Sequence, residues 1–233
     1  MYPIVEFLTG ALFGALYFTY HVEFMRGLYL PVAKSLALIC LLVILIVTDI
    51  RVRLLPDAVN WFGFGLALAF AAVIPPNDPS AYLVVHALKI GYHPQALFGI
   101  LNALLGAAFG SLFLWGAAVL YKLIRKRDGM GMGDVKMMAM VGAFLGVRGA
   151  FLTIFVGTLL GSVVGLGLVT CLFVFGWRRN IAERAARRKL GSPRSLRWAL
   201  AAEYQLPLGS FLGIAAILLI FMSPYVIGGP IFR

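Results

Sequence analysis

The sequence predicts an all-α fold, a polytopic membrane helix bundle of about seven helices, one of them short. Hydrophobic residues make up 62% of the 233 residues and charged residues only 12%, about half the charged share of soluble domains. So few charged groups cannot cover a water-facing surface. The apolar residues gather into runs near the roughly 20 residues that cross a bilayer. Because no backbone group can stay unpaired in lipid, each run is expected to be a helix.

Seven apolar runs follow one another along the chain, which we interpret as one integral-membrane domain over 1–233. We expect helices over 4–20, 31–47, 58–74, 96–121, 135–147, 150–177 and 206–226. The fifth run is too short to cross a bilayer alone. Gly146, Arg148 and Gly149 predict a tight turn between the fifth and sixth runs.

Lysine and arginine gather in alternate loops, which predicts the orientation. Placing 51–56 inside gives the cytoplasmic loops 15 of the 20 Lys and Arg residues, a firm bias under the positive-inside rule. The amino terminus is then cytoplasmic and loop 75–94 external. Loop 178–205 is cytoplasmic and basic, and we interpret its charges as a topology anchor on anionic headgroups or a docking surface for a partner.

Other functional classes find little support. The net charge of +11 does not indicate nucleic-acid binding, because the basic residues lie in short loops and no aromatic platform accompanies them. Cys40 and Cys171 lie inside apolar runs and form no CxxC pair, so neither zinc nor a disulfide is indicated. His21, His86 and His93 fall on the external side, where we interpret them as interfacial polar residues. No metal is expected.

Two aspartates stand out by position. Asp49 ends the second apolar run, and Asp134 begins the fifth after the glycine-rich segment 129–133. Both lie at the cytoplasmic end of a span, and an ionisable group at membrane depth predicts a functional site. Taken singly, Asp134 could cap a helix, and Asp49 could pair with Arg51 or Arg53. As a pair they fit catalysis, a proton relay or a structural role.

If the pair is catalytic, the physics of two neighbouring carboxylates shows how it could hydrolyse a peptide bond. Two carboxylates a few ångströms apart at low dielectric cannot both ionise, so they share a proton. One then accepts a proton from water while the other polarises the carbonyl, and the sequence does not say which acts as base. Gly131 and Gly133 would let backbone pass close to an extended substrate.

Four segments resemble type IV prepilin peptidases, in the order of that family. They are Asp49 with Pro56 seven residues later, the G-x-G-D-x-K segment 131–136 shared with the GxGD intramembrane aspartyl proteases, the segment 206–211 similar to Pro-x-Gly-Pro, and the segment 2–9 that begins Tyr-Pro. Ser210 stands where the family has its second Pro. The resemblance covers nearly the whole chain.

The resemblance implies an enzyme of the bacterial inner membrane. Such peptidases remove the short basic leader of type IV prepilins or type II secretion pseudopilins after a Gly, at the cytoplasmic face. Asp49 and Asp134 would be catalytic. Substrate binding or gating would fall to Gly131, Gly133, Lys136, Pro56, Pro207 and Gly209. Lys136 could also stabilise an ionised Asp134, or simply extend its ammonium group to the membrane surface.

Bifunctional members of the family also methylate the new N-terminus with S-adenosylmethionine. They carry a further span and a zinc-binding domain with paired CxxC motifs ahead of the Tyr-Pro segment, which we expect to be absent here, so zinc is not expected. Glu6 would be the candidate for methyl transfer, or it makes a polar contact within the bundle. Whether methyl transfer is present stays open.

Two rival functions remain. Methyl transfer alone would use Glu6 and its neighbours rather than the aspartates. A membrane transporter or proton channel would use Asp49 and Asp134 as a relay, and it predicts inverted repeats or interrupted paired spans. The sequence shows only scattered glycines.

Overall fold

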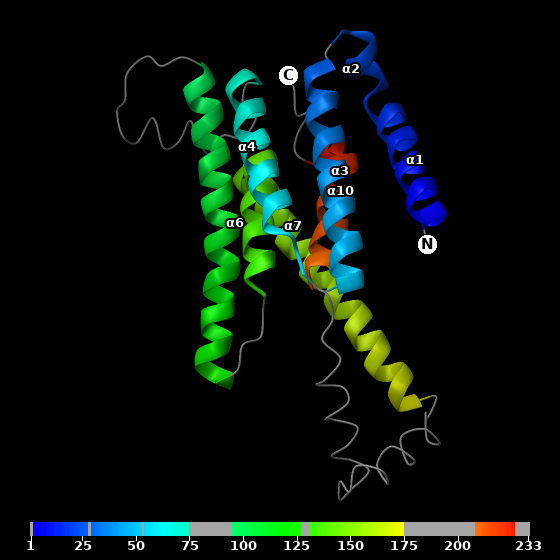
Figure 1. Cartoon of the computed structure of the whole chain (residues 1–233), viewed down its shortest axis with the longest axis vertical. Coiled ribbons are helices and arrows are strands. Elements are labelled where there is room, and N and C mark those ends of the chain that lie inside the picture. Colours follow the sequence, from blue (N-terminus) through cyan, green and yellow to red (C-terminus); the bar gives the residue numbers. More distant parts are fainter. Residues whose placement is uncertain are drawn as a thin grey trace, which may run out of the picture.

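The chain is seen here in a computed structural model that describes residues 2–27, 29–52, 54–74, 95–126, 131–174 and 208–226. Regular structure in these residues is all α-helical, as predicted (Figure 1). The helices are α1 (Tyr2–Thr19), α2 (His21–Met25), α3 (Tyr29–Val52), α4 (Asp57–Val73), α6 (Gln95–Arg125), α7 (Met132–Val174) and α10 (Leu208–Val226). Pro207 and the predictions for loops 75–94 and 178–205 lie outside the described residues.

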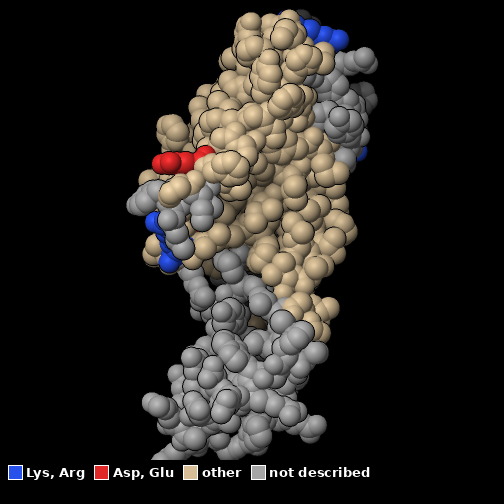
Figure 2. Space-filling view, turned by 90° about the vertical axis from the view of Figure 1, so that its right-hand side faces the viewer, with Lys and Arg blue, Asp and Glu red and all other residues tan. Residues whose placement is uncertain are grey.

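The described helices suit a bilayer. Three stretches are long and apolar enough to cross one: Tyr29–Val52, Ala96–Ile124 and Met132–Gly167. Shorter apolar helices cover Val5–Thr19, Asp57–Val73 and Leu208–Met222. Figure 2 shows a face of the described chain that is almost free of charged groups, with a few basic and acidic spots. Such a surface fits lipid, and the chain is an integral membrane protein.

The fifth and sixth predicted helices are joined in α7. The break falls at Gly146, whose φ of 76° and ψ of −177° are non-helical, while Arg148 and Gly149 already belong to the next helical turn. The predicted break between the fifth and sixth runs is present but is confined to Gly146, because a glycine adopts a positive φ at little cost. The second half of α7 slants away from α6 (Figure 1). Helix α2 was not predicted.

Helix α7 is the centre of the bundle and packs on α6, α10 and α4. Its contact with α6 is a backbone contact, in which Gly106 of α6 meets Gly142 of α7 with no side chain between them. Small residues at such positions let membrane helices approach closely. Helix α10 packs on both α7 and α3, which barely touch each other.

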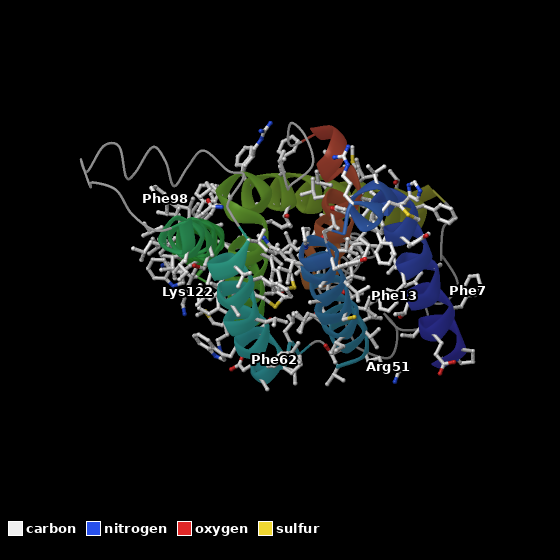
Figure 3. The ribbon with its side chains drawn as sticks, turned by 90° about the horizontal axis from the view of Figure 1, so that it is seen from above. Phe7, Phe13, Arg51, Phe62, Phe98 and Lys122 are labelled. Carbon is white, nitrogen blue, oxygen red and sulfur yellow. The ribbon has the colours of Figure 1, made fainter. Side chains whose placement is uncertain are left out.

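Helix α1 lies at the edge of the bundle. Figure 3 shows Phe7 pointing away from the other helices, and its side chain is 80% exposed. Phe13 lies on the side of α1 that faces α3 and packs on the core. Beyond the end of α1, the Tyr20 hydroxyl donates a hydrogen bond to the Ile220 carbonyl of α10 at 3.0 Å. This bond ties the carboxyl-terminal half of α10 to the turn between α1 and α2.

Four helix ends meet at one end of the bundle, the lower end in Figure 1. They are the carboxyl end of α3 and the amino ends of α4, α7 and α10. The polar residues singled out from the sequence on these helices lie at this end. The fold therefore brings together chain segments that are up to 161 positions apart.

Candidate active site

Asp49 occupies the last turn of α3, and its side chain is only 5% exposed. Its Oδ2 atom accepts two hydrogen bonds from Ser210, one from the backbone N–H and one from the hydroxyl, each 2.7 Å long. A buried carboxylate needs such donors, because desolvation without them is costly. Asp49 is therefore held from the first turn of α10, where backbone N–H groups lack partners within the helix.

Asp134 lies in the first turn of α7 and is 7% exposed. Its backbone N–H donates to the Gly131 carbonyl at 3.2 Å. An aspartate at this position also faces the positive end of the helix dipole. The helix dipole and the turn at Gly131 therefore help to place the carboxyl group of Asp134 at the amino end of α7.

Gly209 of α10 lies between the two carboxyl groups. The position that a Cβ atom would take on Gly209 is 2.7 Å from Oδ1 of Asp134 and 3.1 Å from Oδ2 of Asp49. These two oxygens cannot be further apart than the sum of those distances. Even this upper limit places the two carboxyl groups in one site. The predicted proximity of the two aspartates is confirmed, and the bare backbone of α10 makes it possible.

Leu55 covers the pair from the loop between α3 and α4. Its Cδ1 atom lies 3.3 Å from the Cβ position of Gly209 and 3.0 Å from that of Gly133. Pro56 follows with an extended backbone and begins α4, where its carbonyl accepts the N–H of Val59 at 3.2 Å. The two glycines and this loop therefore form one apolar wall beside the carboxylates.

Lys136 has a different partner from the one that sequence proximity suggested. Its Nζ atom lies 2.6 Å from Oδ2 of Asp57, in the first turn of α4, and the pair is partly exposed. The idea that Lys136 stabilises an ionised Asp134 is thus not what the structure shows. The ion pair instead ties the first turn of α7 to the first turn of α4, directly after Leu55.

Two further residues predicted for the site, Gly131 and Glu6, are exposed in the structure. Gly131 is exposed at the amino end of α7. Glu6 has an exposed side chain on α1, which does not fit the expected polar contact within the bundle.

Sequence reasoning missed Ser210, Asp57 and Asn60. Ser210 was considered only as a replacement for a proline, although a buried hydroxyl in an apolar helix signals a polar partner. Asp57 was not singled out, although it directly follows Pro56. Asn60 is 2% exposed in α4, and its amide nitrogen and oxygen both lack a hydrogen-bond partner in the described part of the chain.

The arrangement can perform general acid–base chemistry. Two buried carboxyl groups lie close together, one fixed by two donors and the other at a helix amino end. A water held there can lose a proton to one carboxyl group while the other donates to a carbonyl oxygen. The fold and site thus define a helical membrane protein with a carboxylate pair at the end of its bundle.

Comparison with known proteins gives the family. The sequence model of the type IV leader peptidase family matches residues 36–166, which contain both aspartates. The chain belongs to this family. No solved structure shows a significant match.

Several curated relatives carry the name prepilin leader peptidase/N-methyltransferase. The one from Neisseria gonorrhoeae is 31% identical over 165 residues, which are 71% of this chain and 48% of the relative. The Pseudomonas aeruginosa relative is 34% identical over 166 residues, with 71% and 48% covered. The Bacillus subtilis relative is 33% identical over 169 residues, with 72% and 55% covered. The chain spans about half the length of these relatives.

Proposed function

We propose that this chain is a prepilin-type leader peptidase in which Asp49 and Asp134 act together as the catalytic pair. The observation that carries the proposal is the meeting of two buried carboxyl groups around Gly209. The family match and the names of the relatives support the same activity. The substrate would be a type IV prepilin or a type II secretion pseudopilin, cleaved at the cytoplasmic face of the bacterial inner membrane.

The reaction needs only the groups described. A water molecule between the carboxyl groups gives a proton to the ionised one and attacks the carbonyl carbon of the scissile peptide. The protonated carboxyl group donates to the carbonyl oxygen. The tetrahedral intermediate then collapses, the C–N bond breaks, and the departing amine takes a proton from the pair. In this proposal peptide hydrolysis uses no metal or organic cofactor.

Methyl transfer is a separate question that can be tested with the same protein. The relatives are named for both activities, and Glu6, the candidate from the sequence, is exposed on α1. The proposal therefore assigns leader cleavage alone to the described site. Transfer of labelled methyl groups from S-adenosylmethionine to a cleaved substrate would add the second activity.

The decisive experiment is cleavage by purified protein in proteoliposomes of phosphatidylethanolamine and phosphatidylglycerol. The substrate carries a basic leader, a Gly before the scissile bond and a following apolar segment. Asp49→Asn and Asp134→Asn should each lose at least about 10³-fold in kcat/KM, as expected when one member of a catalytic unit is removed. Asp57→Asn, a nearby exposed aspartate, is the matched control and should lose no more than about tenfold.

Two results would contradict the proposal. An Asp49→Asn or Asp134→Asn variant that cleaves at the wild-type rate excludes that residue from the pair. Proton flux into liposomes that depends on both aspartates, with no cleavage by the wild type, would instead establish the relay that the sequence left open.

A further inference from the structure

The two carboxyl groups of the site differ in the hydrogen-bond donors that reach them. Oδ2 of Asp49 accepts the backbone N–H and the hydroxyl of Ser210, each at 2.7 Å. No donor among the residues that the structure describes reaches the carboxyl group of Asp134, whose backbone N–H alone is bonded, to the Gly131 carbonyl. Both aspartates are buried. The pair is therefore asymmetric, although its two members are chemically alike.

The donors from Ser210 favour negative charge on Asp49. Hydrogen bonds to the ionised form of a carboxyl group stabilise that form, and such charge-assisted bonds are about twice as strong as bonds between neutral groups. The N–H of Ser210 belongs to the first turn of α10, where it has no partner within its own helix. The positive end of the helix dipole lies at the same turn. All of these effects act on Asp49 in the same direction.

Other charges near the pair do not reverse this preference. Asp134 lies at the amino end of α7, whose dipole also favours an anion. Lys136, two residues further along α7, is paired with Asp57 at 2.6 Å. Arg51 is exposed and lies two residues beyond Asp49, on the opposite side of α3. Two direct bonds to the carboxyl group of Asp49 outweigh a dipole that acts on Asp134 without a bond.

The nearness of the two acids then decides where the proton lies. The position that a Cβ atom would take on Gly209 is 2.7 Å from Oδ1 of Asp134 and 3.1 Å from Oδ2 of Asp49. Two carboxyl groups this close in a buried site hold one proton between them, because a second negative charge is repelled. When the charge is held on Asp49, the proton is held on Asp134.

We propose that Asp49 is the ionised member of the pair and the general base, that Asp134 holds the proton as the general acid, and that Ser210 is the positioning residue that fixes this division. The division of catalytic roles rests on the proposed peptidase function. The place of the proton rests on the hydrogen bonds alone.

The reaction balances with these roles. Water gives a proton to Asp49 as its oxygen bonds to the carbonyl carbon, and the carbonyl oxygen takes the proton of Asp134. When the intermediate collapses, the C–N bond breaks and the departing nitrogen takes the proton from Asp49. One hydroxyl of the intermediate becomes the new carbonyl and returns a proton to Asp134. The pair ends in the protonation state in which it began.

The two donors set this chain apart from the pattern that its sequence resembles. Ser210 stands where that pattern has a proline, and proline has neither an N–H nor a hydroxyl group. A proline in the first turn of a helix removes no hydrogen bond of that helix. The wild type, Ser210→Ala and Ser210→Pro therefore form a series with two donors, one donor and no donor to Asp49.

The first experiment locates the proton without any substrate. The protein is prepared with isotope-labelled aspartate and reconstituted in liposomes at neutral pH, and carboxyl carbon NMR signals are assigned from Asp49→Asn and Asp134→Asn. We expect the Asp49 signal at the chemical shift of a carboxylate and the Asp134 signal at that of a neutral acid. The same protonation state for both, or the reverse assignment, would overturn the proposal.

The second experiment tests Ser210 with the same signals. The preference of the proton for Asp134 should fall about tenfold or more with each donor lost, so that Ser210→Pro spreads the proton over both acids. Ser210→Thr should match the wild type, and so should Ser111→Ala, which removes a hydroxyl bonded within α6. If Ser210→Pro does not fold, Ser210→Ala against Ser210→Thr carries the comparison. Signals that stay unchanged in Ser210→Ala would show that Ser210 does not set the charge.

The third experiment connects the proton to cleavage. Asp134→Asn leaves an amide that still donates a hydrogen bond to the carbonyl oxygen, whereas Asp49→Asn leaves a group that cannot accept a proton from water. Cleavage by Asp49→Asn should therefore be at least about tenfold slower than by Asp134→Asn. The reverse order would overturn the assigned roles. If the wild type cleaves no substrate, the peptidase proposal falls, while the NMR signals still decide where the proton lies.

Discussion

Gly209 and Asp134 are in contact through bare backbone: a Cβ atom on Gly209 would lie 2.7 Å from Oδ1 of Asp134, closer than real Cβ atoms come. The same position is 3.1 Å from Oδ2 of Asp49. The two carboxyl groups thus approach each other across a residue without a side chain.

Gly209→Ala should therefore displace the carboxyl groups and reduce cleavage. Because misplacement of reacting groups by about 1 Å can cost 10²-fold, kcat should fall by about that factor while the protein stays inserted. Gly65→Ala, where an added Cβ meets nothing within 4 Å, is the matched control. Single-turnover cleavage rates measure the effect, and a fully active Gly209→Ala variant would show that the pair tolerates the displacement.

Ser210 is a positioning residue for Asp49. Ser210→Ala removes the hydroxyl bond and keeps the backbone N–H bond, and each is 2.7 Å long in the structure. A hydrogen bond to a charged group contributes about 1.5–3 kcal/mol, so kcat should fall about tenfold or more with KM nearly unchanged. Thr at this position should restore most of the rate. A change confined to KM would contradict the role.

The Lys136–Asp57 pair should matter more for activity than for stability. An exposed ion pair contributes about 0.2–1 kcal/mol, but this one fixes the loop that carries Leu55 over the carboxylates. Lys136→Met and Asp57→Asn should each lower kcat/KM about three- to tenfold. The double variant should lose no more than either single one, as in a coupled double-mutant cycle. Additive losses would show that the two residues act separately.

Gly106 should be essential for the contact between α6 and α7. An added Cβ there would clash with the Gly142 carbonyl oxygen and approach the Gly146 carbonyl carbon at 2.7 Å. Overpacking of this kind costs about 1–3 kcal/mol, so Gly106→Ala should lower the midpoint of thermal unfolding in detergent. Gly116→Ala on the same helix meets nothing within 4 Å and should leave it unchanged. Equal midpoints would refute the close packing.

The helices and the aspartate pair could be predicted because they depend on signals local to the sequence. The run 58–74 became α4 within one residue at each end, since an apolar stretch in lipid must be helical. The matching depth of Asp49 and Asp134 followed from the loop charges. Because both aspartates were predicted at the same membrane depth, their side chains were expected at the same level of the bundle.

The partners of individual side chains could not be predicted, because they depend on how each helix is rotated. Lys136 is close to Asp134 in sequence, yet residues two apart point to opposite sides of a helix, and Lys136 pairs with Asp57 instead. Helices that are apolar all round show no face that fixes their rotation. The hydrogen bonds between Ser210 and Asp49 cross 161 positions, and no local pattern in the sequence indicates them.

The place of α10 has a consequence for biosynthesis. Among the described helices it is the last to leave the ribosome, and it supplies both the donors to Asp49 and the backbone that separates the two acids. A nascent chain that has inserted only α1 to α7 has α3 and α7 barely in contact, so its acids are not yet held together. In the proposed peptidase, the two acids would therefore be held together only after α10 has been made and inserted.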